Sequence, residues 1–228
     1  MQRGGGVKPE ELSGIFLTHI HIDHCVELPA VVFARYLAGV VNEEGGRSSA
    51  FPVYGTPDVV CFCAKLFGEG EIYGFASEMM KGLRGTGIEV AAYGAEDEVV
   101  YDEGGLVVRT FRVVHDDLVR TVALRFEYEG KVVTFSGDTE FCPGIIEAAR
   151  GADLFVAECS FPEGMRIKGH ITPDELARVA VEAGCERMVA NHISTPWMGR
   201  EGGLEEIMRR EGYEGAVEMG WDLMEVVV

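Results

Sequence analysis

The spacing of apolar and polar positions predicts an α/β chain, with helices and strands alternating in its first third. Apolar residues recur at helical spacing in some segments and form short continuous runs in others, which are typical of buried strands. Before residue 88 the predicted elements are a helical turn at Lys8–Leu12, a strand at Gly14–Leu17, a helix at Leu28–Leu37, a strand at Phe51–Gly55 and a helix from about Pro57 to Phe67. The segment Gly68–Gly87 is either a mobile apolar flap or an ordinary helix and loop whose methionines fill gaps in the core. We favour the helix and loop, because a sequence pattern alone does not place a flap over a pocket.

The pattern changes after residue 88, where β-branched and aromatic residues dominate. We predict a meander of four strands, Ile88–Tyr93, Leu106–Val114, Thr121–Tyr128 and Lys131–Ser136. Glu129 and Gly130 form the tight turn between the last two of these strands.

Helices and strands alternate again in the last third of the chain. The predicted elements are a helix at Pro143–Arg150, a strand at Asp153–Ala157, a helix that begins after Thr172, a strand at Arg187–Ala190, a helix at Leu204–Arg210 and a terminal strand at Leu223–Val228. Thr172 and Glu175 have the spacing of a capping box, and Gly184 is a helix-ending residue. With 228 residues and no linker or repeat, the chain is expected to be one α/β domain over residues 1–228.

The charge balance narrows the range of partners. Against 38 acidic residues stand 20 Lys and Arg, which gives a net charge of −18. Because nucleic-acid binding draws its affinity from clustered basic residues, long nucleic acids are disfavoured, though a local basic patch would still allow them. No apolar run is long enough for a membrane span, and the first six residues lack the apolar core of a signal sequence, so we expect a soluble intracellular protein.

The six cysteines have no CxxC spacing and no compact disulfide framework. Reduced thiols in the cytoplasm are therefore the expected state. Cys61 and Cys63 follow an apolar pair of valines, so we interpret both as small core residues.

The segment Thr18–His24 concentrates the candidate chemistry. His19, His21, Asp23 and His24 lie within six residues, between a predicted strand and a predicted helix. In an extended backbone His19 and His21 point to the same side, whereas Asp23 and His24 fall in the turn and could hold a second ion. A histidine-rich surface loop is the alternative, but with only 6 histidines in the chain this density favours a metal site for zinc, manganese or iron(II).

These residues resemble the HxHxDH motif of the metallo-β-lactamase superfamily, and the likeness extends from about Ile15 to the C-terminus. Ser136-Gly137-Asp138-Thr139 and the later segments around Glu158 and His170 look most like the ribonuclease Z and phosphodiesterase branch. The resemblance implies an αββα sandwich that binds two divalent ions, Zn²⁺ in the first place and Mn²⁺ or Fe²⁺ as alternatives. It also implies the ligand sets: His19, His21 and His115 for one ion, Asp23, His24 and His192 for the other, and Asp138 as a bridge.

The same resemblance implies hydrolysis by a water molecule that the metals activate. Asp23, Glu158 and His170 are the implied catalytic residues, with Glu158 and His170 as the pair that protonates the leaving oxygen. The alternative is that Glu158 merely closes a strand and His170 decorates a loop. Arg166, Lys168 and Arg200 are further candidates for binding a phosphate, although isolated surface basic residues are more often simply solvated.

Two differences from related enzymes argue against oxygen reduction and against hydrolysis of β-lactam antibiotics. His21 stands where oxygen-reducing di-iron relatives have glutamate, and Asp138 stands where zinc β-lactamases have cysteine. Hydrolysis of a small or cyclic phosphodiester is therefore the favoured function. The alternatives are a 3′-processing tRNA endonuclease, for which we find no counterpart of the tRNA-gripping arm, and a non-catalytic metal-binding protein.

The N-terminal part is short for this family, since only eighteen residues precede His19. Either Met1 is not the true start, or the fold lacks the strands that normally open it. Lost strands would leave an open sheet edge that can pair with another chain. We therefore expect a homo-oligomer in which a neighbouring subunit covers this edge.

Overall fold

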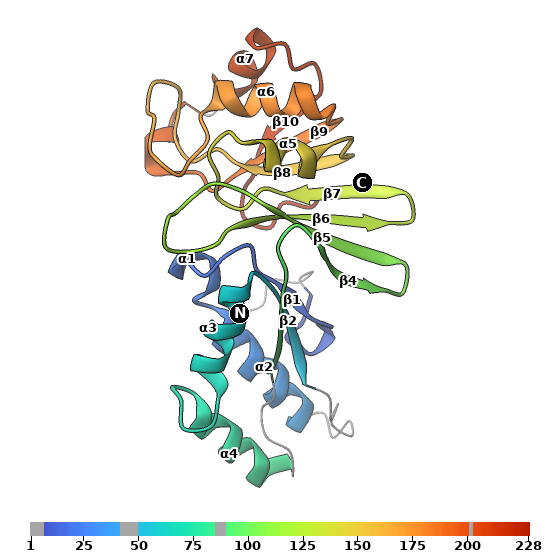
Figure 1. The fold of residues 1–228 in the computed structure, drawn as a ribbon, viewed down its shortest axis with the longest axis vertical. Helices are drawn as coiled ribbons and strands as arrows, with labels where there is room; N and C mark the ends of the chain where they lie inside the picture. The colour runs from blue at the N-terminus through green and yellow to red at the C-terminus, as the bar shows by residue number, and fades with distance from the viewer. Residues whose placement is uncertain (1–6, 42–49, 85–89, 201–202) are drawn as a thin grey trace. The chain divides into compact units, whose positions relative to one another are not determined.

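The computed structural model describes residues 7–41, 50–84, 90–200 and 203–228, and the chain divides into two compact units (Figure 1). The first unit is Met1–Gly94 and the second is Ala95–Val228. Each unit contains one β-sheet with helices among the described residues, so the predicted α/β class is confirmed. Within the described ranges, none of the helices has the length and apolarity that crossing a bilayer requires.

The first unit is built on a parallel sheet of three strands in the order β1-β2-β3. Its elements are a 3₁₀ turn at Pro9–Glu11, β1 (Ile15–Phe16), α1 (Ile22–Cys25), α2 (Leu28–Val41), β2 (Phe51–Gly55), α3 (Pro57–Phe67), α4 (Gly74–Arg84) and β3 (Val90–Gly94). Buried and partly exposed residues alternate along β2, and Phe51 and Val53 pack with Val32 of α2 and Val59 of α3 in the core. The segment Gly68–Gly87 thus contains a helix, α4, as we favoured over a flap. Its residues 85–87 lie outside the described ranges.

A close backbone approach fixes where the chain leaves β1. The Leu17 amide donates a hydrogen bond to the Tyr54 carbonyl at 2.8 Å. A Cβ atom at Gly55 would lie 2.6 Å from the Leu17 carbonyl oxygen, so only glycine fits at this position. The start of the histidine-rich segment is therefore anchored on β2.

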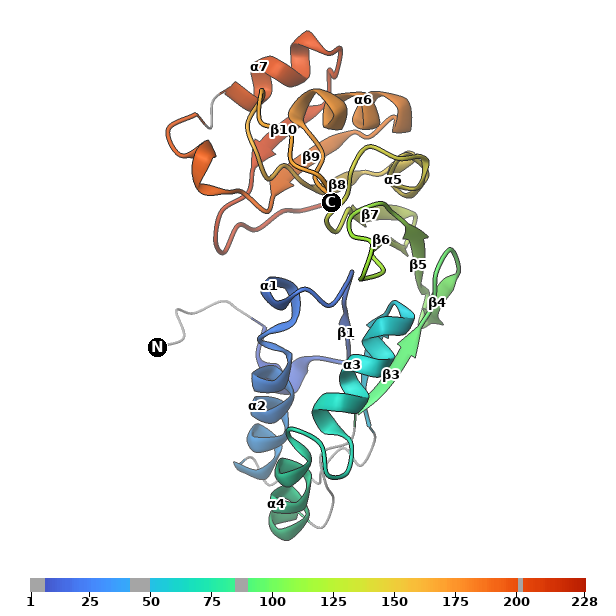
Figure 2. The ribbon, with the colours of Figure 1, turned by 60° about the vertical axis from the view of Figure 1, so that its left-hand side comes forward.

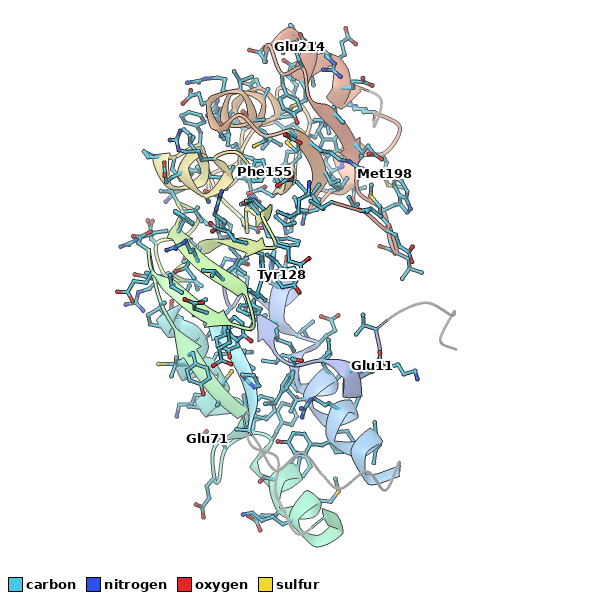
Figure 3. All side chains as sticks on the ribbon, turned by 90° about the vertical axis from the view of Figure 1, so that its right-hand side faces the viewer. Glu11, Glu71, Tyr128, Phe155, Met198 and Glu214 are labelled. Atoms are coloured by element: carbon cyan, nitrogen blue, oxygen red, sulfur yellow. The ribbon has the colours of Figure 1, made fainter. Side chains whose placement is uncertain are left out.

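The second unit is built on a seven-stranded sheet in the order β10-β9-β8-β7-β6-β5-β4. Its strands are β4 (Val99–Glu103), β5 (Leu106–Arg112), β6 (Val122–Tyr128), β7 (Lys131–Phe135), β8 (Leu154–Glu158), β9 (Arg187–Asn191) and β10 (Ala216–Met219). Its helices are α5 (Pro143–Ala149), α6 (Pro173–Ala183) and α7 (Gly203–Arg210), with a 3₁₀ turn at Thr195–Trp197. All three helices contribute to one core on the sheet, and Phe155 of β8 is fully buried in it (Figures 2 and 3).

Strand direction brings four loops of this unit to one edge of the sheet. β4 to β7 pair antiparallel in succession, whereas β7, β8, β9 and β10 pair in parallel. Therefore β5, β7, β8 and β9 all run in the same direction, and their carboxyl ends meet at one edge. In α/β sheets this edge is where ligands usually bind.

The strand predictions were wrong in three places. The predicted strand Ile88–Tyr93 does not belong to the meander: it corresponds to β3 of the first unit, which pairs in parallel with β2. Ile88 and Glu89 lie outside the described ranges. β4 was not predicted at all. No strand covers Leu223–Val228, because the strand that pairs with β9 is Ala216–Met219.

The interpretation of the two neighbouring cysteines was half right. Both lie on α3, where residues two positions apart point in different directions. Cys63 is buried, but Cys61 is exposed.

Candidate metal centre

The first unit gathers three imidazole rings just after β1. The His19 ring centroid lies 4.7 Å from that of His21 and 4.2 Å from that of His24. The Asp23 carboxylate lies 3.4 Å from His24 Nε2. Asp23 and His24 belong to the short helix α1 rather than to a simple turn, and His21 is its N-cap residue. All four sequence-predicted ligands of this unit thus lie in one cluster.

Hydrogen bonds hold this cluster in shape. Thr18 Oγ1 lies 3.0 Å from His19 Nδ1, so Nε2 is the nitrogen of His19 that we expect to bind a metal. The Cys25 thiol donates to the carbonyls of Ile20 and His21 at 3.4 and 3.1 Å. Burial, and then the nearby carboxylates, raise the pKa of Cys25. The thiol therefore stays protonated and supports the loop as a donor instead of acting as a thiolate ligand.

Asp138 is the centre of the cluster in the second unit. It follows β7, is 3% exposed, and its Oδ2 lies 3.8 Å from His115 Nε2 and 3.4 Å from His192 Nε2. Two imidazole nitrogens therefore face the same carboxylate oxygen. His115 follows β5 and His192 follows β9, so the shared edge of the sheet explains why these three residues meet.

A glycine lets the loop after β8 approach His115. The Gly169 carbonyl lies 2.7 Å from His115 Nδ1 and is positioned to accept its N–H, which leaves Nε2 facing Asp138. Gly169 has a φ of +87°, and a Cβ there would lie 2.6 Å from the His115 carbonyl oxygen and 2.9 Å from Nδ1. A side chain at position 169 would therefore displace His115 or the loop.

Glu158 and His170 form a pair beside this cluster. His170 Nδ1 lies 3.1 and 3.0 Å from the two carboxylate oxygens of Glu158. Glu158 is 1% exposed and also accepts hydrogen bonds from the Thr139 amide and the Ser160 hydroxyl. The His170 ring stacks on His192 at 5.7 Å between centroids and lies 5.1 Å from His115. Glu158 therefore ends β8 and also contacts His170, Thr139 and Ser160 through its carboxylate.

Three supporting groups were missed by the sequence analysis. They are the Thr18 hydroxyl at His19, the Gly169 carbonyl at His115 and the Ser160 hydroxyl at His192. Only Ser160 left a signal in the sequence: it stands two residues after Glu158 and would share its face if the strand continued. The carbonyl could not have been found, because every residue has one.

The donors of both clusters suit a divalent metal. In the second unit, ligand atoms of His115, Asp138 and His170 lie within 4.8 Å of one another, and so do those of Glu158, His170 and His192. Imidazole nitrogens grouped around a buried carboxylate are the donor set that zinc, manganese and iron(II) prefer. In the first unit, three imidazoles and Asp23 offer the same chemistry.

Comparison with known proteins agrees with this chemistry. Residues 3–193 match the model of the beta-lactamase superfamily domain. Ribonuclease Z of Mycobacterium marinum is 29% identical over 235 residues, which cover 98% of this chain and 82% of that protein. The metallo-beta-lactamase fold protein YhfI of Bacillus subtilis superposes with a TM-score of 0.70 at 21% identity, covering 93% of this chain and 76% of its own.

A diphosphatase of the PhnP family has the same fold. Its TM-score is 0.64 at 16% identity, and the match covers 95% of this chain and 72% of that one. The match to the domain model spans well over half of the sequence. The chain therefore belongs to the beta-lactamase superfamily, on its ribonuclease Z-like branch with the metallo-β-lactamase fold, as the sequence predicted.

Proposed function

We propose that the protein is a dinuclear metal-dependent phosphodiesterase that acts on a small or cyclic phosphodiester. The observation that carries this proposal is the buried Asp138 carboxylate facing His115 and His192, with the Glu158–His170 pair beside them. We further propose that His19, His21, Asp23 and His24 complete the ligand sets of the same two ions. Two divalent ions, most simply Zn²⁺, would activate a water molecule and offset the charge of the phosphate.

The protein's own acid–base pair would act on the leaving group. His170 Nδ1 can donate to the Glu158 carboxylate, which orients the ring and leaves Nε2 as the nitrogen that passes a proton to the leaving oxygen. The bond that breaks is the P–O bond to this oxygen, and the proton neutralises the alkoxide. Buried Glu158 stabilises the charged ring without taking part in the bond exchange.

A groove next to His170 offers room for the substrate. Its volume is about 370 Å³, and its lining includes Arg166, Lys168 and His170. Arg166 is paired with Glu175 at 2.7 Å and Lys168 with Asp117 at 2.8 Å. Exposed pairs of this kind are worth only about 0–1 kcal/mol, so an anionic substrate could exchange with the carboxylates at little cost. Because Glu140 and Glu175 also line the groove, a small anion would bind there by taking the place of carboxylates at Arg166 and Lys168.

The role of His170 is tested with two substrates that differ in their leaving groups. His170→Gln keeps a side-chain N–H but cannot transfer a proton, and His170→Ala removes both. On a 2′,3′-cyclic nucleotide, whose leaving group is an alkoxide, both variants should lose about 10²–10⁴-fold in kcat. On bis(p-nitrophenyl) phosphate the loss should be smaller, because p-nitrophenolate leaves without a proton.

Metal content of each variant serves as the control for an intact centre. Equal losses on the two substrates would point to damage of the metal site, and unchanged rates would remove His170 from the mechanism. A wild-type chain that holds two ions but hydrolyses neither substrate would refute the phosphodiesterase proposal and favour a non-catalytic metal-binding role.

A second candidate function is 3′-end processing of tRNA. It is favoured by the 29% identity to ribonuclease Z of Mycobacterium marinum along nearly the whole chain. The acidic balance of the chain opposes it, since phosphate backbones are repelled by a net charge of −18. Site-specific cleavage of a precursor tRNA at physiological salt, lost in His170→Ala, would establish this function in place of the first.

We also propose a cytoplasmic homo-oligomer. β1 is the edge strand of its sheet among the described residues, and an edge strand can pair with a strand of a neighbouring chain. Light scattering at micromolar concentration should give at least twice the chain mass of 24.9 kDa, and a monomer would contradict the proposal.

A further inference from the structure

Ser160 lies where the acid–base pair and a candidate metal ligand meet. It follows β8 and is 1% exposed. Its Oγ lies 2.5 Å from Glu158 Oε2, 2.7 Å from His192 Nδ1 and 3.2 Å from His170 Nδ1. A single hydroxyl thus contacts three side chains of the site within hydrogen-bonding distance.

The proton inventory of these groups fixes the direction of each bond. The Ser160 hydroxyl donates its single proton to Glu158 Oε2. The Ser160 oxygen can then only accept, and the His192 ring at 2.7 Å must supply its Nδ1–H. His170 Nδ1 lies closer to the Glu158 carboxylate, at 3.0 Å, than to Ser160, at 3.2 Å, so its proton is directed to Glu158.

This arrangement selects one tautomer of His192. With the proton on Nδ1, the lone pair is on Nε2, which is the nitrogen that faces Asp138 Oδ2 at 3.4 Å. The other tautomer would direct two lone pairs toward each other at Ser160 and would present an N–H to the metal site. A metal ligand needs the first tautomer.

Hydrogen bonds from neighbouring residues also hold the backbone around Ser160 and His192 in position. His192 has a φ of +55°, in the left-handed region that residues other than glycine rarely adopt. The Ser160 carbonyl accepts hydrogen bonds from the amide and the hydroxyl of Ser194. The Trp197 indole donates to the Cys159 carbonyl at 2.6 Å. The strained backbone of His192 therefore persists because its neighbours fix it next to Ser160.

We propose that Ser160 is a positioning residue that sets the tautomer and orientation of His192 and connects this ligand to Glu158 through a hydrogen-bond chain. Glu158 then has two tasks, because it orients His170 directly and His192 through Ser160. The inference rests on the proposed function only in taking His192 as a metal ligand.

The test compares Ser160→Ala with two matched variants of the full-length chain. Ser160→Thr keeps the hydroxyl, and Ser194→Ala removes a neighbouring hydroxyl that bonds to a backbone carbonyl and to no ring. Nitrogen-15 NMR of the imidazoles, before and after addition of Zn²⁺, reports the tautomer of His192. Competition with a chromophoric chelator reports the affinity for Zn²⁺.

In the wild type, Ser160→Thr and Ser194→Ala, we expect His192 to carry its proton on Nδ1. In Ser160→Ala we expect a mixture of tautomers and an affinity for Zn²⁺ about 10–100-fold weaker. An unchanged tautomer and affinity in Ser160→Ala would overturn the inference. An Nε2–H tautomer in the wild-type chain would overturn it even if a variant failed to fold.

Failure of the proposed function gives a different result. In that case the tautomer and the Zn²⁺ affinity would still depend on Ser160, while the wild-type chain would hydrolyse no phosphodiester. Neither NMR nor chelator competition requires turnover, so the two failures are distinguishable.

Discussion

Gly169→Ala and Gly164→Ala form a matched pair that tests how the loop after β8 positions His115. Both glycines have a φ of +87°, so alanine at either position should cost about 1–2 kcal/mol of unfolding free energy from backbone strain alone. They differ in surroundings. No atom lies within 4 Å of a Cβ at Gly164, whereas a Cβ at Gly169 would lie 2.6 Å from the His115 carbonyl oxygen.

The size of the resulting shift follows from contact distances. Ordinary contacts of a Cβ begin at 3.4 Å, so Gly169→Ala should push His115 or the loop away by about 0.8 Å. A misplacement of about 1 Å can cost about 100-fold in rate, and the same displacement weakens the hydrogen bond from His115 Nδ1 to the Gly169 carbonyl. Urea denaturation should therefore show a larger stability loss in Gly169→Ala than in Gly164→Ala, because only the first adds a steric clash to the backbone strain. Zn²⁺ competition and turnover should show a loss of metal affinity and phosphodiesterase activity in Gly169→Ala alone. Equal metal affinity and activity in the two variants would refute the positioning of His115 by Gly169.

Two further predictions concern pH and thiol chemistry. The hydrogen bond from Lys131, and then that from the Val132 amide, lower the pKa of Asp153. The ionised carboxylate therefore stabilises the fold above its ordinary pKa of about 3.9, and this contribution is lost as pH falls through the lower pKa of the folded state. Urea midpoints measured from pH 7 to pH 3 should fall less steeply toward acid pH in Asp153→Asn than in the wild type, and an unchanged slope would contradict this. Burial raises the pKa of Cys63 to about 11 and that of Cys185 to about 12, whereas Cys61 is exposed. The native protein should therefore react with Ellman's reagent in one rapid phase, and Cys61→Ser should remove this phase. A rapid phase that persists in Cys61→Ser would contradict the burial of the other thiols.

Elements with local determinants were predictable from the sequence. The capping box of Thr172 and Glu175 begins α6, and Gly184 ends it in the left-handed conformation at φ +67°. Glu129 and Gly130, with φ values of +49° and +80°, form the expected turn between β6 and β7. In each case the residues that fix the geometry are neighbours in the sequence, so the pattern alone contains the information.

Strand pairing was harder to predict, because the partner of a strand is distant in the sequence. The apolar character of Val90–Gly94 correctly indicated a strand, but only the crossover through α3 and α4 makes it pair in parallel with β2. The valines at the C-terminus have high β propensity, yet Ala216–Met219 provides the strand beside β9. Propensity reports the fit to a pleated surface and does not identify the partner.

In the candidate site, too, features fixed by neighbouring residues were predictable, whereas features fixed by distant contacts were not. The motif residues His19 to His24 and the later candidate ligands were predicted from residue types, spacing and resemblance, and the structure brings them into one cluster in each unit. The groups that orient them depend on approaches between loops, such as the Gly169 carbonyl at His115 and the Ser160 hydroxyl at His192. The left-handed backbone of His192 has no sequence signal either, because it results from the tertiary contacts around it.

The proposed function requires that one pair of metal ions binds to the ligand sets of both units. Anomalous diffraction from crystals of the metal-loaded chain, collected at the absorption edge of each candidate metal, tests it most directly. We predict two peaks about 3.5–4 Å apart, with Asp138 bound to both ions, His19, His21 and His115 on one, and Asp23, His24 and His192 on the other. A single peak, or peaks coordinated by the residues of only one unit, would contradict the proposal.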